Sequence, residues 1–253
     1  MEELLKRGEE KLSSAEAKAI LDTNHSVDMA MFGRMVADDA AYNVDAAVQV
    51  AHAIGIHGST PDFDYFTAVD DLAEEGEETG AGMIGTVQMM SSTLYRYATV
   101  NLNGLEKNLG SAEVARQAAG QFIEAFIASM PTGKINTFAN QTLPELVYVA
   151  IRDTRPVSLV NAFETPVLEG TQASYKFETG AKENHKSRRT IAAERLAKEA
   201  RDIQDVYGFA PRAAFVMGMG DLAAPFEGIA EEATLAGLTE RVDEELNRLA
   251  GDN

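Results

Sequence analysis

The segment at residues 55–85 constrains the fold more than any other part of the chain. It is rich in Gly, Asp and Glu, and its one aromatic island consists of Phe63, Tyr65 and Phe66. Connections inside compact domains are usually only a few residues long, and a structureless connection of this length is uncommon. We therefore expect residues 55–85 to be either a functional loop or a disordered one.

The charge of this region has one sign. Between Met35 and Tyr95 the chain has eleven Asp and Glu residues and no Lys or Arg, and the formal net charge of the whole chain is −18. Nucleic-acid binders usually carry a basic surface, because neutralised phosphates and released counterions supply much of their affinity. Composition alone therefore argues against nucleic-acid binding, unless basic residues elsewhere offset this segment.

Composition also limits the class of protein. The 253 residues, 45% of them hydrophobic, are enough for one large domain or two small ones with a core. The absence of Cys excludes disulfides, Cys-ligated zinc and thiol nucleophiles, and fits the reducing cytoplasm in which we expect the protein. No apolar run approaches the ~18 residues of a membrane span, so we expect no membrane contact.

The N-terminal half predicts four elements. Apolar residues among charges indicate a helix at 2–21, and the apolar run before Gly33 favours a short strand at 27–32. Asn43 is a good N-cap for a helix over residues 44–54. Aromatic and β-branched residues predict strand structure within 87–102.

The C-terminal half also predicts a mixture of helices and strands. Ser111 caps a predicted helix that runs to about Ser129, with Phe122 and Phe126 at helical spacing. Further predicted elements are strands at 146–151 and 213–217, helices at 190–207 and 226–249, and a basic loop or boundary at 182–189. Together these elements predict an α+β fold without regular βαβ alternation.

The candidate catalytic and metal patterns are weak. Asp62, Asp64, Asp70 and Asp71 belong to an acidic run, but an EF-hand starting at Asp62 needs Gly and Glu where the chain has Thr67 and Ala73. His52 and His57 are five residues apart, so they share a helical face poorly. We interpret the run as a solvated acidic loop and predict no metal and no cofactor.

The aromatic island indicates a different chemistry. Aromatic side chains in a polar loop serve either as a small local core or as groups that insert into a partner. Single-stranded nucleic acid can be held by stacking and apolar wedging, which needs no local positive charge. The densest basic cluster, which contains Arg188 and Arg189, is either a solvated linker or a phosphate contact.

Six motifs, in this order, carry a resemblance to a known family. They are VDMAMFGRM (27–35), AHAIGIH (51–57), DYFTAVDDL (64–72), GAGMIGT (80–86), SSTLYRYATVNL (91–102) and RPVSLVNAF (155–163). Their order and spacing resemble the CasC family, the backbone subunit of the type I-E CRISPR Cascade complex. The resemblance fades after about residue 175.

The resemblance implies a right-hand architecture. An RRM-like (ferredoxin-like) palm carries helical fingers and a thumb hairpin; family members begin with an additional palm strand and a basic segment, so we expect an incomplete palm here. The implied division is a fingers region with a palm strand at 1–56, a thumb at 57–85, the palm at 86–180 and a C-terminal helical region at 181–253.

The resemblance also implies an RNA-binding site. Tyr65, Phe66 and Thr67 would form the tip of the thumb, with Met83 and Ile84 on its returning strand. Met35, beside Gly33 and Arg34, would wedge RNA near the palm. The remaining implied RNA-binding residues are His57, Arg96, Arg188 and Arg189, the arginines as phosphate contacts.

The implied function is that of a non-catalytic subunit. It would polymerise along CRISPR RNA beside neighbouring copies of itself and other Cascade subunits, and meet target DNA indirectly. Two alternatives stay open on the residues alone. One is a metal-dependent nuclease or phosphoesterase using the acidic loop, and the other is an acidic protein-binding module.

Overall fold

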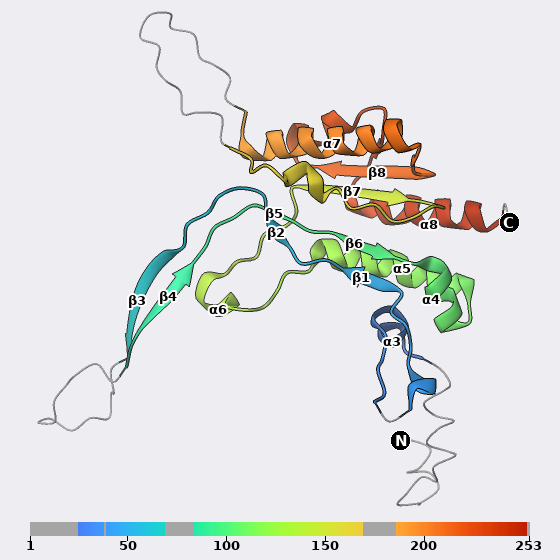
Figure 1. Ribbon diagram of the computed structural model, residues 1–253, viewed down its shortest axis with the longest axis horizontal. Coiled ribbons are helices and arrows are strands. Elements are labelled where there is room, and N and C mark those ends of the chain that lie inside the picture. Colours follow the sequence, from blue (N-terminus) through green and yellow to red (C-terminus); the bar gives the residue numbers. More distant parts are fainter. Residues whose placement is uncertain (1–24, 38, 69–82, 169–185, 252–253) are drawn as a thin grey trace, which may run out of the picture. The chain divides into compact units, whose positions relative to one another are not determined.

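The computed structural model describes residues 25–37, 39–68, 83–168 and 186–251. Contacts between residues group the chain into two units. The first unit comprises Met1–Ala51, Tyr97–Val157 and Ile203–Asn253, and the second comprises His52–Arg96 and Ser158–Asp202. Helix α7 (Arg188–Tyr207), labelled in Figure 1, has residues in both units. The predicted helix at 2–21 lies outside the described residues.

The first described element of the first unit is a short helix, α3 (Val27–Phe32), where we expected a strand. The Ser26 hydroxyl accepts a hydrogen bond from the backbone N–H of Met29, and Gly33 ends the helix with φ +80°. Ala30 and Met31 are buried. The strand prediction is wrong because a short apolar run fits a strand and a buried helix equally well. The N-cap Ser26 favours the helix.

The predicted helix at 44–54 is also wrong. This part of the chain contains β1 (Val48–Val50), which pairs antiparallel with β6 (Ala98–Val100), and β2 (Ile54–Gly55) of the second unit. The side chain of Asn43 accepts a hydrogen bond from the backbone N–H of Val36 instead of capping a helix. Tertiary pairing with β6 therefore outweighs the local cap pattern at these β-branched residues.

Helices α4 (Leu102–Leu109) and α5 (Ala112–Ala128) follow β6. The predicted N-cap and end of α5 are confirmed, because Ser111 accepts from the backbone N–H of Val114 and the helix ends at Ala128, with Ser129 as its C-cap. Small residues of α5 share a buried core with residues of α3, β1 and α4. The buried residues of this first core are Ala30, Met31, Ala47, Val48, Leu105, Ala115, Ala118 and Ala119.

A three-stranded sheet with order β7-β8-β9 completes the first unit. Strands β7 (Leu146–Ile151) and β8 (Ala213–Gly218), both confirmed, run antiparallel, whereas β9 (Glu231–Glu232) runs parallel to β8. Helices α5 and α8 (Leu235–Gly251) contact each other beside this sheet. The second core contains Ile127, Phe215, Leu238, Val242 and Leu246.

The predicted start of the last helix, at residue 226, is wrong. Residues Gly220–Phe226 form the 3-10 helix η3, and β9 then precedes α8. Pro225 lies inside η3, where its missing N–H and fixed φ do not suit a continuous α-helix. The remaining short elements of the described residues are η1 (Ala40–Tyr42), α6 (Ile135–Phe138) and η2 (Val160–Phe163).

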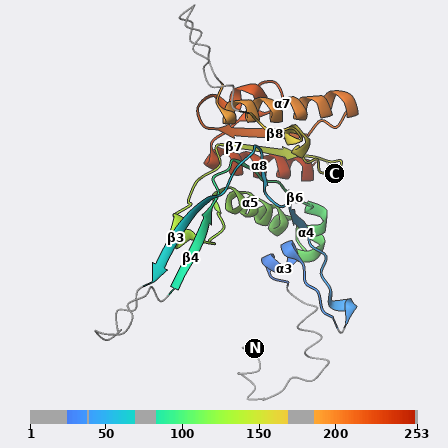
Figure 2. The same ribbon diagram turned by 60° about the vertical axis from the view of Figure 1, so that its left-hand side comes forward.

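The second unit holds a long β-hairpin. The short pair β2 with β5 (Leu94–Tyr95) leads into the longer antiparallel pair β3 (Asp62–Ala68) with β4 (Met83–Met89), visible as a two-stranded ribbon in Figure 2. The buried core of the second unit consists of Ile56, Phe163, Val167 and Ala192. The α+β class is thus confirmed. Within the described residues, no helix is both long and apolar enough to cross a membrane.

Candidate nucleic-acid interface

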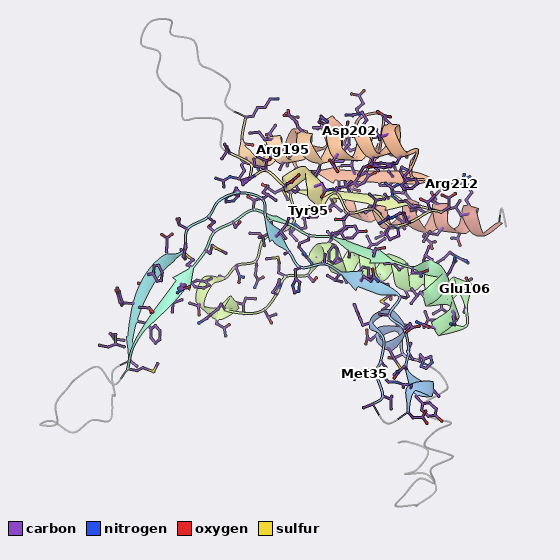
Figure 3. The ribbon with its side chains drawn as sticks, in the orientation of Figure 1. Met35, Tyr95, Glu106, Arg195, Asp202 and Arg212 are labelled. Carbon is purple, nitrogen blue, oxygen red and sulfur yellow. The ribbon has the colours of Figure 1, made fainter. Side chains whose placement is uncertain are left out.

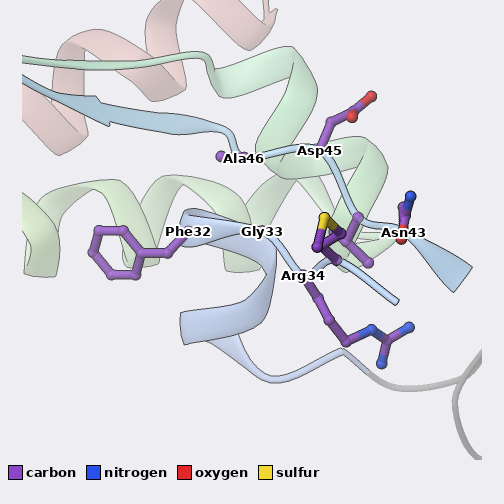
Figure 4. Close-up of a pocket in the computed structure, with 8 residues that line it drawn as sticks. Phe32, Gly33, Arg34, Asn43, Asp45 and Ala46 are labelled. Atoms are coloured by element: carbon purple, nitrogen blue, oxygen red, sulfur yellow. The ribbon is translucent and has the colours of Figure 1, made fainter. Parts of the chain in front are cut away.

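A cavity of about 390 Å³ lies beside the C-terminal end of α3 (Figure 4). It is formed by the end of this helix and by the chain that returns toward β1. Its lining residues are Phe32, Gly33, Arg34, Met35, Asn43, Val44, Asp45 and Ala46. The cavity therefore brings together three predicted site residues, Gly33, Arg34 and Met35.

A β-bridge joins the two walls of this cavity. The backbone N–H of Arg34 donates to the Val44 carbonyl at 3.0 Å, and that of Val44 donates back to Arg34 at 2.9 Å. Gly33 makes this approach possible, because a Cβ at this position would lie 2.7 Å from the Val44 carbonyl oxygen. Its φ of +80° with ψ 173° is also a conformation reserved for glycine.

The two side chains that follow Gly33 have different environments. The Arg34 guanidinium donates through Nε and Nη2 to the carbonyl oxygen of Tyr42, at 3.1 and 2.6 Å, which holds the cation on this loop. Met35, labelled in Figure 3, is 82% exposed. This edge of the cavity thus combines an oriented positive charge with an exposed flexible apolar side chain.

Asn108 is a positioning residue that sequence reasoning missed. Its side-chain amide, on α4, donates to the carbonyl oxygens of Ala30 and Asp45, each at 2.9 Å. These carbonyls belong to α3 and to the opposite wall of the cavity. The only signal in the sequence is an Asn near the end of a helix, a position where this residue is usually exposed.

The predicted thumb residues lie on the two strands of the hairpin. Tyr65, Phe66 and Thr67 belong to β3 and pair with Thr86, Gly85 and Ile84 of β4. They therefore occupy a strand, whereas we expected the tip of the hairpin. The residues that connect β3 to β4, 69–82, lie outside those described.

The pairing places these side chains on two faces. Residues opposite each other in an antiparallel pair share a face, and neighbours along a strand alternate. Tyr65, Thr67 and Ile84 therefore share one face, where Tyr65 is 75% and Ile84 70% exposed. Phe66 and Met83 lie on the other face, also exposed. The hairpin thus presents large apolar groups on both sides.

The remaining predicted RNA-binding residues belong to the second unit. Arg188 and Arg189 begin α7 instead of lying in a loop. Nη1 of Arg188 lies 3.2 Å from Nε2 of His57, a residue near the base of the hairpin. Arg96 follows β5 directly. The structure thus brings His57 and Arg188 together.

Tyr95 anchors the SSTLYRYATVNL motif at residues 91–102. Its hydroxyl accepts a hydrogen bond from the backbone N–H of Leu159 at 3.0 Å and lies 3.4 Å from the Ser158 hydroxyl. Its ring, labelled in Figure 3, packs against Phe163. Burial raises the pKa of the Tyr95 hydroxyl, and its hydrogen bonds only partly oppose this.

The acidic residues of β3 do not form a metal site with described neighbours. Asp62 and Asp64 share one face of the strand and are exposed. Among the residues that the structure describes, no group of three or more His, Asp or Glu side chains gathers closely enough to hold a metal ion. Asp70 and Asp71 lie outside the described residues.

Comparisons with known proteins give a consistent result. The profile of the CT1975-like protein family matches residues 1–241. A chain of a solved "CRISPR RNA-guided surveillance complex, pre-nicking" is 33% identical with a TM-score of 0.73, over 92% of this chain and 58% of that one. A chain of a "CRISPR RNA-guided surveillance complex" is 34% identical with a TM-score of 0.68, over 91% of this chain and 82% of that one.

These comparisons also define the extent of the similarity. The chain spans little more than half the length of the first of these structures. No curated protein matches it significantly in sequence. The expectation that the resemblance fades after residue 175 is wrong, because the family profile continues to residue 241. The resemblance that the six motifs indicated is confirmed, and this chain belongs to the CT1975-like family.

Proposed function

We propose that the chain is a non-catalytic, RNA-binding backbone subunit of a type I-E CRISPR surveillance complex. The observation that carries the proposal is the similarity, at 33 and 34% identity over more than 90% of the chain, to chains of two CRISPR RNA-guided surveillance complexes. Copies of the chain would line up along CRISPR RNA, beside other Cascade subunits, and meet target DNA through the RNA.

The hairpin supplies the groups that this function needs. Bases of single-stranded RNA stack on aromatic side chains and are separated by apolar wedges. Tyr65 with Ile84 on one face, and Phe66 with Met83 on the other, offer such surfaces without a cation nearby in sequence. The lack of Lys and Arg in this region is therefore compatible with a hairpin that shapes RNA and leaves the phosphates to other residues.

Phosphate contacts would come from arginines outside the hairpin. Arg34 is held on the cavity edge by the Tyr42 carbonyl, beside the exposed Met35. Arg96 and the pair Arg188 and Arg189 lie at the ends of β5 and α7. We propose that the two units correspond to parts of an RRM-like palm with helical fingers, and that the hairpin is the thumb.

The experiment is to co-express the protein with a CRISPR array and to analyse the purified material. We expect oligomers that contain RNA and dissociate after nuclease treatment. Recovery of a uniform, RNA-free monomer would contradict the proposal. Oligomers that survive nuclease treatment would support the protein-binding alternative, and Mg²⁺-dependent cleavage lost in Asp64→Asn would support the nuclease alternative.

A further inference from the structure

His57 makes three hydrogen bonds at the base of the β3–β4 hairpin. Its Nδ1 lies 2.6 Å from the carbonyl oxygen of Gly58. Its Nε2 lies 3.0 Å from the backbone nitrogen of Thr93, on the opposite leg of the hairpin, and 3.2 Å from Nη1 of Arg188. Both ring nitrogens are thus engaged within the second unit.

These partners fix the protonation state of the ring. The Gly58 carbonyl can only accept a hydrogen bond, so Nδ1 carries the proton. The Thr93 amide and the Arg188 guanidinium can only donate, so Nε2 must be unprotonated and share its lone pair between them. The arrangement therefore requires the neutral imidazole with its proton on Nδ1.

The ring replaces a backbone group in the hairpin ladder. Beyond the pair β2 with β5, the Ile56 amide donates to the Thr93 carbonyl at 3.0 Å. The Thr93 amide then donates to the His57 ring where a regular ladder would offer a carbonyl, and farther out the Ser59 hydroxyl donates to the Ser91 carbonyl at 2.8 Å. The ring is thus one of the few links between the legs before β3 and β4 begin.

The same ring ties the hairpin to α7. Arg188 is the first residue of that helix, whose Ala192 and Ile191 pack with Ile56 in the core of the unit. A single imidazole therefore connects both legs of the hairpin, at Gly58 and Thr93, to the helix that supports their base.

We propose that neutral His57, together with Arg188, is a positioning clasp that fixes the base of the hairpin, and that protonation of the ring opens this clasp. The clasp is a property of the protein alone. The effect of the clasp on RNA assembly rests on the proposed function, because the position of the hairpin matters for RNA only if the hairpin wedges RNA bases.

The surroundings of the ring make protonation disruptive. Among the residues that the structure describes, Arg188 from α7 is the charged side chain hydrogen-bonded to the ring, and both legs of the hairpin reach the ring with backbone groups. Lys186 and Arg189 flank Arg188, and Lys186 is paired with Glu194 at 2.6 Å. A proton on Nε2 would turn an N–H toward two other donors and place a positive charge beside the guanidinium. Histidine is the side chain that changes charge between about pH 5 and 8.

Amide hydrogen exchange of the whole protein at pH 8 and pH 5.5 tests the clasp. The protection of the Thr93 amide, corrected for the intrinsic pH dependence of exchange, is expected to fall about fivefold at the lower pH, the effect of losing one net hydrogen bond. The Val44 amide, bonded to Arg34 in the other unit, is expected to keep its protection. Thr93 protection at pH 8 that is no greater in the wild type than in His57→Asn would overturn the proposal.

Three variants test the roles of the two ring nitrogens separately. In His57→Gln the side-chain oxygen takes the place of Nε2 as an acceptor that cannot be protonated, so Thr93 should stay protected at both pH values. In His57→Asn the shorter side chain can replace only Nδ1, which faces the Gly58 carbonyl. The Thr93 amide should therefore be unprotected at both pH values. His52→Asn, at an exposed histidine nearby, should behave as the wild type. Loss of Thr93 protection at pH 5.5 in His57→Gln would also overturn the clasp.

RNA assembly provides an independent readout. At pH 8, His57→Asn should weaken assembly on CRISPR RNA severalfold, and His57→Gln should weaken it less. Equal weakening by both variants would mean that the ring touches RNA directly, which would overturn the positioning role. Failure of every form, including the wild type, to bind RNA would contradict the proposed function and leave the exchange result standing.

Discussion

The ring of Phe66 lies across Gly85 of the neighbouring strand. A Cβ on Gly85 would stand 2.5 Å from Cζ and 2.6 Å from Cε1 of that ring. The two residues are direct partners in the β3–β4 register. An aromatic ring that covers a cross-strand glycine compensates for its missing side chain and helps to pin the register.

We expect the Hα protons of Gly85 to show an upfield chemical shift caused by this ring. Phe66→Leu should abolish the shift, whereas Tyr65→Leu, on the opposite face, should leave it. Gly85→Ala should push the ring aside at small cost, because the atoms it meets are the far end of a rotatable side chain. NMR of the labelled protein checks all three, and a normal Gly85 shift in the wild type would contradict the packing.

Stacking and phosphate contacts should differ in their salt dependence. Tyr65→Ala and Phe66→Ala are each expected to weaken RNA assembly by about 1–3 kcal/mol without changing the slope of log affinity against log salt. These side chains release no counterions, so only the intercept should move. Affinities measured across a salt series check this, and a slope change of about one would indicate lost phosphate contacts instead.

Arg34→Gln should change the slope of log affinity for RNA against log salt concentration. If Arg34 binds a phosphate, its removal should reduce the salt slope by about one. Arg212→Gln is the matched control, because Arg212 is engaged with Asp153 at 2.6 Å on the surface of the same unit. An unchanged slope in Arg34→Gln would remove this residue from the proposed phosphate contacts and leave it a loop-holding role through Tyr42.

Gly33→Ala should destabilise the first unit more than a comparable change elsewhere. Both Gly33 and Gly110 have positive φ, +80° and +71°, but a Cβ on Gly33 would meet the Val44 carbonyl at 2.7 Å whereas none lies within 4 Å of Gly110. Gly110→Ala should therefore cost about 1 kcal/mol for its backbone conformation alone, and Gly33→Ala clearly more. Urea denaturation measures the difference, and equal midpoints would contradict the close approach.

The sequence predicted those elements whose signals are local. Helix α5 carries its own caps, Ser111 and Ser129, and β7 is a continuous apolar run, so both were placed correctly. The run at Val27–Phe32 is too short for periodicity to decide, and residues 44–54 are set by pairing with β6, a partner far along the chain. Local sequence patterns therefore could not predict the secondary structure of either segment.

The candidate site shows the same limit. Its residue types were recognised from motifs, but their faces depend on the register of β3 with β4, which a one-residue shift would reverse. Asn108 could not be found at all, because its two carbonyl partners come from separate segments brought together only by folding.

Asn108→Ala should therefore cost stability as well as the shape of the cavity. It removes two hydrogen bonds and leaves the Ala30 and Asp45 carbonyls without this donor, for which about 1–3 kcal/mol is expected. Asn103→Ala, at an exposed position of the same helix, should cost much less. The free energy of unfolding of both variants checks this, and equal losses would show that Asn108 does not hold the two walls.

Tyr95→Phe tests the anchor of the second unit through its pH dependence. The pKa of Tyr95 is raised by burial, so the folded protein retains its hydroxyl proton at pH values where the unfolded chain has lost it. The unfolded chain then binds fewer protons, and the free energy of unfolding decreases as pH rises above the ordinary tyrosine pKa of about 10. Tyr95→Phe should be less stable at pH 7, by about 1–3 kcal/mol, because the Leu159 N–H loses its acceptor. It should also lose less stability between pH 9 and pH 11 than the wild type, as measured by urea denaturation. Parallel curves for the two proteins would mean that Tyr95 titrates alike in the folded and unfolded states, and that its hydroxyl is not held as described.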